Sequence, residues 1–168
     1  MIDNDIDLNL KKVRWFNVKT AWNIYMATYC DHLRRFQGYS YPPTHMNFKE
    51  FLKYYNSNDS VLLFAKYKDM CIGLLEVVDK DKNRKTLSRI WLLPEYLDLG
   101  FIPKIISKFE QCFPDVVEWN LGSCNLLKTD IEACKKNGWK TVASLERMSD
   151  RCTTIQMEKK QTKTYEHI

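Results

Sequence analysis

Two carboxylates, Glu76 and Glu118, interrupt segments of the chain that are otherwise apolar. Glu76 lies within Leu-Leu-Glu-Val-Val at residues 74–78, and Glu118 lies within Val-Val-Glu-Trp at residues 116–119. Side chains alternate between the two faces of a strand, so a carboxylate at either position faces a cleft or faces solvent. In a cleft, a carboxylate can transfer protons to and from a reacting group. We therefore treat both residues as candidates for acid–base chemistry.

The cysteines carry no metal-binding or redox pattern. No Cys-x-x-Cys pair occurs, so the sequence predicts neither a zinc site nor a redox dithiol. We expect reduced thiols, mostly packed as small apolar side chains. Residues 79–83 begin like a calcium loop, but Arg84 replaces the required glycine and Ile90 stands where the bidentate glutamate belongs. The sequence therefore predicts no metal site.

A loop rich in aromatic residues contains Tyr39, Tyr41 and His45. Pro42 and Pro43 lie between them, and two prolines cannot continue a helix. Tyrosines beside prolines form a rigid rim that suits recognition of another molecule. The same side chains would equally serve to hold the loop against the core. Both interpretations stay open at this stage.

Composition indicates one folded domain. The chain has 168 residues and a mass of 20.0 kDa, with 45% hydrophobic and 28% charged residues, which is typical of a globular protein rather than a disordered one. The net charge of +5 is spread along the chain, so we expect no nucleic-acid partner. No apolar stretch approaches the ~20 residues of a membrane helix, and residues 1–5 are acidic where a signal peptide is basic. We expect a cytoplasmic protein without membrane contact.

Hydrophobic periodicity predicts an alternation of strands and helices. We expect strands at residues 13–18, 61–67, 71–78, 87–93, 116–121, 139–146 and 153–157. We expect helices from Thr20 to about Phe36, after an Asn47 cap, over 102–113 and over 129–136, the last ending at Gly138. The order predicts a mixed α/β fold with a flexible terminus at 1–10, one domain at 11–160 and a polar tail at 161–168.

That order, together with two local segments, resembles the GNAT superfamily of N-acetyltransferases. Residues 90–102 run from a strand through Pro94-Glu95-Tyr96 to Gly100 and a helix, which is similar to the family's V-x-P-E-Y followed by [RQ]-x-x-G-x-[GA]. Residues 132–139 are similar to its F-Y-E-K-x-G-F. The resemblance implies a GNAT-like α/β (α+β mixed) fold, with a central mixed, mostly antiparallel sheet of six or seven strands and about four helices.

The resemblance implies acetyl-CoA as acyl donor. Backbone groups at a strand that separates from its neighbour pair with pantetheine, and a side-chain-poor loop at a helix N-terminus binds the pyrophosphate. The positions that match these parts of the family's cofactor site are Leu92 and Leu93 for pantetheine, Asp98, Leu99, Gly100, Phe101 and Ile102 for pyrophosphate, and Asn125 near the cofactor.

The resemblance also implies an N-acyltransferase in which a primary amine attacks the thioester directly. Glu76 or Glu118 would be the base, and Cys134 occupies the position of the tyrosine that protonates the leaving thiolate. Cys134 is otherwise simply packed on its helix. The aromatic loop would shape the pocket for a small-molecule or protein amine. Family members often form homodimers, so a homodimer is expected.

Four departures from the family pattern define an alternative function. Leu97 replaces the Arg/Gln position, Asp98 adds negative charge, Ile102 replaces a small residue and Cys134 replaces the tyrosine. Asp98 would also serve as a helix N-cap that occupies the free N–H groups itself. The alternative is a degenerate, non-catalytic GNAT-fold module for binding or regulation, with weak or no CoA binding.

Overall fold

The computed structural model describes residues 7–35, 45–57, 60–124, 128–147 and 153–161. The described part contains seven strands and four α-helices in the order that follows. The elements are β1 (Leu8–Lys12), a 3-10 turn (Trp15–Asn17), α1 (Val18–Arg35), α2 (Phe48–Tyr55), β2 (Val61–Tyr67), β3 (Met70–Asp81), β4 (Arg84–Leu92), a second 3-10 turn (Pro94–Tyr96), α3 (Phe101–Cys112), β5 (Glu118–Cys124), α4 (Lys128–Lys136), β6 (Lys140–Arg147) and β7 (Thr153–Lys160).

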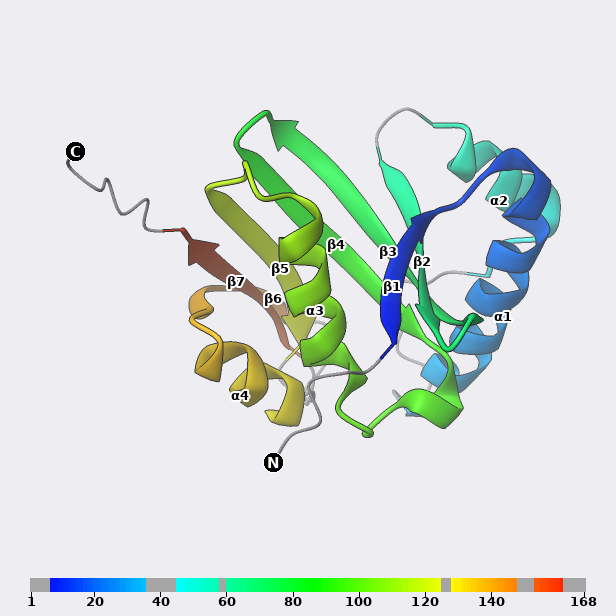
Figure 1. Ribbon diagram of the computed structural model, residues 1–168. Coiled ribbons are helices and arrows are strands. Elements are labelled where there is room, and N and C mark those ends of the chain that lie inside the picture. The colour runs from blue at the N-terminus through cyan, green and yellow to red at the C-terminus, as the bar shows by residue number, and fades with distance from the viewer. Residues whose placement is uncertain (1–6, 36–44, 58–59, 125–127, 148–152, 162–168) are drawn as a thin grey trace.

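All seven strands form one sheet in the order β1-β2-β3-β4-β5-β7-β6 (Figure 1). Neighbouring strands are antiparallel, except that β4 and β5 run parallel. The helix α3 provides the crossover that a parallel connection requires. The fold class expected from the sequence, a mixed and mostly antiparallel sheet with four helices, is confirmed.

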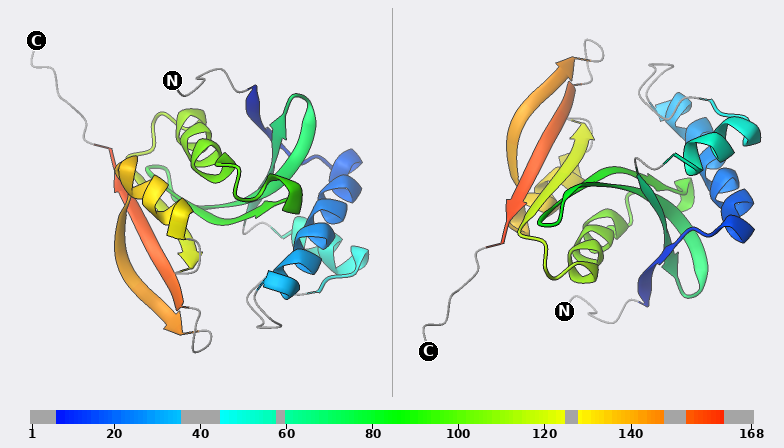
Figure 2. Two further views of the ribbon diagram at one scale, coloured as in Figure 1. Left: turned by 90° about the horizontal axis from the view of Figure 1, so that it is seen from below. Right: turned by 90° about the horizontal axis from the view of Figure 1, so that it is seen from above.

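Helices cover the two faces of the sheet unequally (Figure 2). One core cluster joins α3 and α4 to residues of β1, β2, β3, β4, β5 and β7, and its centre includes Leu75, Leu87, Ile105 and Phe109. A second cluster joins α1 and α2 to residues of β2, β3 and β4 on the other face, and it includes Trp91. This second cluster contains no described residue of β5, β6 or β7. Among the described residues, no helix covers the face opposite α3 over β5 and β7, and we call this the open face.

Local turn and cap residues act as the sequence predicts. The side chain of Asn47 accepts a hydrogen bond from the Glu50 N–H at 3.0 Å, and the Glu50 side chain accepts one from the Asn47 N–H at 2.8 Å, so both ends of a capping box are made. Gly138 ends α4 with φ +88°, a conformation in which a side chain is strained. The turn between β2 and β3 contains Lys68 and Asp69, both with positive φ.

The first strand lies earlier than predicted. The β-forming residues 13–18 do not form it; β1 spans Leu8–Lys12 and pairs with β2, and residues 8–10, which we assigned to a flexible terminus, belong to this strand. Val13 is 1% exposed, but Trp15 and Phe16 are 79% and 69% exposed. Propensity misled here because pairing with β2 and burial of Leu8 decide the strand, not the residue types alone.

Candidate functional site

The parallel strands β4 and β5 separate partway along the sheet. Their pairing runs from Arg84 opposite Glu118 to Leu87 opposite Leu121 and ends there, while β4 continues to Leu92. A β-bulge at Ser88 interrupts the pairing of β4 with β3 at the same level, and bulges increase the local twist of a strand. The two strands therefore form a V that opens toward their carboxyl ends.

The backbone of β4 offers hydrogen-bonding groups to this opening. The N–H of Leu93 donates to the Ile72 carbonyl of β3 at 2.9 Å. Because N–H and C=O directions alternate along a strand, the backbone groups of Leu92 point away from β3 and toward the V. Of the two residues predicted to contact pantetheine, Leu92 has the suitable backbone orientation, whereas the Leu93 N–H is used inside the sheet.

The loop after β4 leads into the N-terminus of α3. Asp98 and Gly100 both adopt left-handed conformations, with φ +60° and +76°. The helix N-cap is Gly100, not Asp98. A Cβ atom placed on Gly100 would meet nothing within 4 Å, so space is open beside the loop. The first backbone N–H groups of a helix have no acceptor within the helix, so this loop has the geometry of an anion site.

Two of the family departures are explained by packing. Leu97 and Ile102 are partly buried against the core cluster beneath α3. Phe101 is 9% exposed, and its ring lies 5.1 Å from that of Tyr67 and 5.6 Å from that of Tyr96. Leu99 projects outward, at 62% exposure, and Asp98 is exposed as well. The apolar side chains of Leu97, Phe101 and Ile102 thus pack toward the core and do not cover the backbone of the loop.

Negative charge near the loop at residues 97–100 would repel a bound anion. Burial, and then the negative charge of Asp98, raise the pKa of Asp130 in the first turn of α4. Asp98 and Asp130 therefore lie close enough to repel each other, at the start of α3 and the start of α4. The backbone of this site fits a pyrophosphate, whereas these two carboxylates weaken its attraction for one.

Glu76 is buried in a polar cluster on the α1–α2 face. Its side chain is 9% exposed; it accepts a hydrogen bond from the Tyr54 hydroxyl and lies 3.7 Å from the Arg89 Nε. Burial, and then the hydrogen bond to Glu76, raise the pKa of Tyr54, so this phenol stays a proton donor. Arg89 lies opposite Glu76 on the separated part of β4. A hydrogen bond from Tyr54 and an ion pair with Arg89 thus hold the carboxylate on β3, next to the separated part of β4.

Glu118 lies at the closed end of the strands. It is opposite Arg84 on β4 and Lys160 on β7, with 4.0 Å between its Oε2 and the Lys160 Nζ. Glu76 is instead opposite Arg89, five residues further along β4, which corresponds to roughly 16 Å. The structure therefore does not bring the two candidate carboxylates together.

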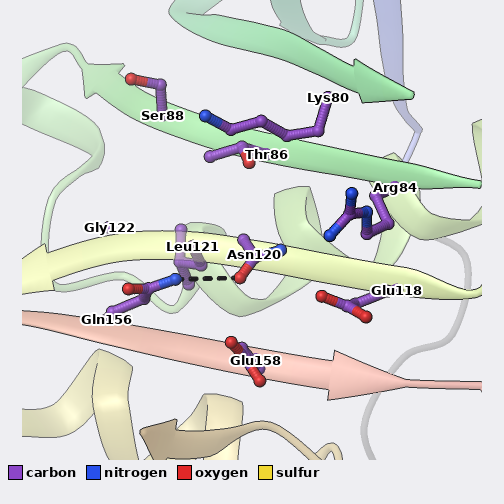
Figure 3. A pocket seen from close by; sticks show the side chains of 10 residues that line it. All are labelled: Lys80, Arg84, Thr86, Ser88, Glu118, Asn120, Leu121, Gly122, Gln156 and Glu158. Carbon is purple, nitrogen blue, oxygen red and sulfur yellow. Dashed lines mark hydrogen bonds between the residues drawn. The ribbon is translucent and has the colours of Figure 1, made fainter. Parts of the chain in front are cut away.

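A groove of about 490 Å³ crosses β4, β5 and β7 on the face opposite α3 (Figure 3). Trp119 and Leu121 belong to the core beneath α3, so the alternate residues Glu118, Asn120 and Gly122 project to the groove side. A Cβ atom on Gly122 would lie 3.3 Å from the Ser88 carbonyl oxygen. The glycine keeps the floor of the groove low where β4 and β5 begin to part.

Cys134 lies away from the V. It is 3% exposed and lines a cavity of about 30 Å³, formed with residues of α3, β7 and the turn between α4 and β6 but none of β4 or β5. Burial, with the charges of Asp130 and Glu110, raises the pKa of this thiol to about 11. Glu110 is itself held by the Trp139 Nε1 at 2.8 Å and the Lys159 Nζ at 2.6 Å. The thiol stays protonated but is packed among these residues.

The aromatic loop lies largely outside the described residues. Tyr39 and Tyr41 fall there, as does Asn125 after β5. His45 is described and exposed, and its ring lies 5.7 Å from that of Tyr29 on α1.

The described thiols do not all pack in the core. Cys134 is buried and Cys71 is partly buried, but Cys30 and Cys112 are exposed, so the expectation of mostly packed cysteines is wrong for these two. No group of three or more His, Cys, Asp and Glu side chains among the described residues has an arrangement that could hold a metal ion. No described helix is both long and apolar enough to cross a membrane.

Sequence reasoning missed the partners that give these residues their properties. Tyr54 follows the apolar pattern of α2, and nothing in its neighbourhood along the chain shows that it reaches Glu76, 22 residues later. From the sequence, Asp130 is an ordinary acidic residue in the first turn of a helix, and nothing indicates that it lies near Asp98. Lys80 and Glu158, which line the groove, lie in exposed-looking charged segments. Only the register of the sheet brings them together.

The sheet order, the parallel V and the glycine loop at a helix N-terminus define the GNAT-type α/β fold. Comparison with family models found no match, and no curated protein matches the sequence. Solved structures do match. Spermidine N-acetyltransferase from Vibrio cholerae, in complex with CoA and spermine, superposes with a TM-score of 0.73 at 15% identity, covering 94% of this chain and 97% of that chain.

Two further structures agree. The dodecameric spermidine N-acetyltransferase from Vibrio cholerae gives a TM-score of 0.69 at 15% identity over 95% of this chain and 97% of that chain. A protein assigned as a phosphinothricin N-acetyltransferase superposes with a TM-score of 0.70 at 9% identity, covering 91% of this chain and 98% of that chain. At such identities the likeness establishes a shared fold, which confirms the fold implied by the sequence resemblance.

Proposed function

We propose that this protein is an acyl-CoA-dependent N-acetyltransferase and a divergent member of the GNAT superfamily. The observation that carries the proposal is the V between β4 and β5, open beside the left-handed loop at Gly100 and the N-terminus of α3. The shared fold with N-acetyltransferases, one of them solved with CoA, supports it. Bound acetyl-CoA would supply an activated acetyl thioester, which a neutral primary amine attacks directly.

The donor and the acceptor would bind on opposite faces of the sheet. The donor would lie on the α3 side, with its pyrophosphate on the backbone of residues 98–102 and its pantetheine arm against the Leu92 backbone. The acceptor would approach from the opposite face, where the groove ends at Ser88 and Gly122. The two reactants then meet within the V, and neither has to pass the other.

We propose Glu76, in preference to Glu118, as the group that takes the proton from the acceptor ammonium, directly or through one water. Glu76 lies beside the separated part of β4, whereas Glu118 is at the closed end with Lys160. The hydrogen bond from Tyr54 and the charge of Arg89 fix its orientation. Cys134 remains a proposal for protonating the leaving thiolate, although its burial away from β4 and β5 favours a packing role.

The alternative is a non-catalytic module, and the charges of Asp98 and Asp130 favour it. They place negative charge where a pyrophosphate would bind. Replacing both with asparagine discriminates between the two functions better than changes at Leu97 or Ile102, because those side chains pack in the core. A large gain in CoA affinity in the double variant, from no measurable binding in the natural protein, would favour the alternative.

Calorimetric titration of the full chain with acetyl-CoA tests the proposal. We expect saturable binding below ~1 mM, the upper end of ordinary KM values. Leu99→Glu should weaken binding several-fold by adding charge to an exposed loop position, while Leu99→Gln, of matched size, should not. Val142→Glu adds the same charge at another exposed site and should have no effect. Absence of binding in the natural protein at ~1 mM would refute the enzymatic function.

Assembly and cellular location stay predictions of the sequence. We keep the expected homodimer, since family members often dimerise and the spermidine N-acetyltransferase with the same fold is dodecameric. Light scattering on the purified protein tests it. We also keep the cytoplasmic location, which a tagged copy of the full chain in its native cell would test.

A further inference from the structure

The groove on the open face of the sheet has a regular layout. Strand register arranges its lining in three rows that cross β4, β5 and β7. From the V outward, the first row is Ser88 next to Gly122 and Gln156, and the second is Thr86, Asn120 and Glu158. The third is Arg84 and Glu118, with Lys160 opposite Glu118 just outside the lining. Successive rows are about 7 Å apart, since every second residue faces the same side. The groove therefore extends away from the V along the strands.

Opposite charges line its two sides. Lys80 of β3 and Arg84 of β4 contribute cations on one side, and Glu158 of β7 contributes an anion on the other (Figure 3). Arg84 is paired with Asp81 at 2.6 Å and Glu118 with Lys160 at 4.0 Å. Within the part of the chain that the structure describes, neither Lys80 nor Glu158 has an ion-pair partner. The groove thus presents one uncompensated charge of each sign.

The floor between these charges is polar. The Gln156 Nε2 donates to the Asn120 Oδ1 at 3.0 Å, which leaves the Asn120 amide N–H groups for another acceptor. The Thr86 Oγ1 is buried and has no hydrogen-bond partner among the described residues. A buried polar atom without a partner destabilises a protein, and an ordered water is one way to satisfy it. The floor therefore has hydrogen-bonding capacity for a polar molecule.

We propose that this groove binds a small zwitterion, an amine that also carries a carboxylate, as the acceptor substrate. The inference rests on the proposed function for its catalytic meaning, but the binding itself does not. The carboxylate would lie toward Lys80 and Arg84, and the ammonium toward Glu158 and the end of the groove at Ser88 and Gly122. Charge complementarity then places the ammonium on the β7 side of the groove, one row nearer the V than Arg84.

The same arrangement disfavours related ligands. A diamine of equal length would place its second cation beside Lys80, which has no carboxylate partner among the described residues. A plain alkylamine would leave Lys80 without a partner and gain nothing from it. A dicarboxylate would meet Glu158. Specificity in this groove therefore arises from repulsion as well as attraction.

Binding without acetyl-CoA tests the inference directly. We would titrate the full chain, by NMR and calorimetry, with ω-amino acids, alkylamines and diamines of two, four and six carbons. At the best chain length we expect the amino acid to bind at least tenfold tighter than both matched amines. Lys80→Glu should reverse this order in favour of the diamine. Lys82→Glu should not, because Lys82 is exposed in the β3–β4 turn and does not line the groove.

Glu158→Gln should weaken all three amine classes and leave thermal stability unchanged. If no length of amino acid binds tighter than its matched amines, or if Lys82→Glu acts like Lys80→Glu, the inference is wrong. Acetyl transfer, measured separately, distinguishes this from failure of the proposed function. If the amino acid binds but is not acetylated, only the enzymatic proposal is overturned. If amines are acetylated with no preference for those that carry a carboxylate, only the zwitterion inference is overturned.

Discussion

At the scale of single residues, Glu76 has the environment expected of a functional group. A buried carboxylate is unfavourable unless it is paired and hydrogen-bonded, and Tyr54 and Arg89 supply those contacts from α2 and β4. Such clusters occur both at catalytic sites and in structural ion-pair networks. A kinetic measurement separates the two interpretations.

We predict that Glu76→Gln lowers kcat by on the order of 10²–10⁴-fold while KM for acetyl-CoA stays the same, because the amide accepts the Tyr54 hydrogen bond but cannot take a proton. Glu118→Gln should change kcat far less. Steady-state kinetics of the two variants side by side provide the check: a large loss of kcat in Glu76→Gln alone supports the base. Equal losses in both variants would contradict it.

Asp130 links stability to pH. Its pKa is raised above the ordinary 3.8 in the folded protein, so the folded state holds this proton longer than the unfolded chain. Stability from this group is present below 3.8 and is lost as the pH rises through the folded pKa. We predict that Asp130→Asn increases the free energy of unfolding at pH 7 but not at pH 3, measured by urea denaturation.

Asp98→Asn should act in the same direction with a smaller effect, because the charge of Asp98 is the second cause of the shift after burial. Asp115→Asn, at an exposed turn position, is the control and should change little. If Asp130→Asn lowers stability at pH 7, the carboxylate is stabilised in the fold and the interpretation of its environment is wrong.

At the scale of elements, the contact between β3 and β4 requires a glycine. A Cβ atom on Gly73 would lie 2.5 Å from the Trp91 carbonyl oxygen, which is closer than real Cβ atoms approach. Trp91 in turn packs its ring 5.6 Å from that of Tyr25 on α1. Glycine at this position therefore lets β4 hold both its sheet contacts and its contact with α1.

We predict that Gly73→Ala destabilises the protein by about 2 kcal/mol, because the strands must shift to relieve the contact. Gly122→Ala is the matched control, since its Cβ would meet the Ser88 carbonyl oxygen at 3.3 Å and needs only a small adjustment. Urea unfolding of both variants measures the difference. Equal stability losses would show that the β3–β4 contact is not the restricting one.

At the scale of the whole molecule, one sheet supports two separate helical layers. Leu74 and Leu75 are neighbours in sequence and both fully buried, yet Leu74 packs with α1 and α2 whereas Leu75 packs with α3 and α4. The alternation of a strand produces this division. Because β2, β3 and β4 contribute to both clusters, the two layers are expected to unfold together.

We predict that Leu74→Ala and Leu75→Ala each lower the free energy of unfolding by roughly 2–5 kcal/mol. Each variant should still unfold in one transition, with tryptophan fluorescence and far-UV circular dichroism following the same curve. Trp91 reports on one layer, and Trp119 and Trp139 report on the other. Two separated transitions in either variant would show that the layers are independent.

The sequence by itself determined the elements and their order. Local rules were sufficient for the Asn47 cap, the Gly138 terminus and the strand at 61–67, because each depends on residues a few positions apart. They failed for the first strand, where pairing with β2 overrode the β-forming types at Trp15 and Phe16.

Only the tertiary structure decided which groups act together. From the sequence, Glu76 and Glu118 were equally good candidates for the base. The register of β3, β4 and β5 places Glu76 next to the separated part of β4 and Glu118 at the closed end of the V. It also brought Tyr54 to Glu76, and it set Lys80 and Glu158 on opposite sides of one groove. Such neighbours lie tens of residues apart in the chain, and no local periodicity encodes strand register across a sheet.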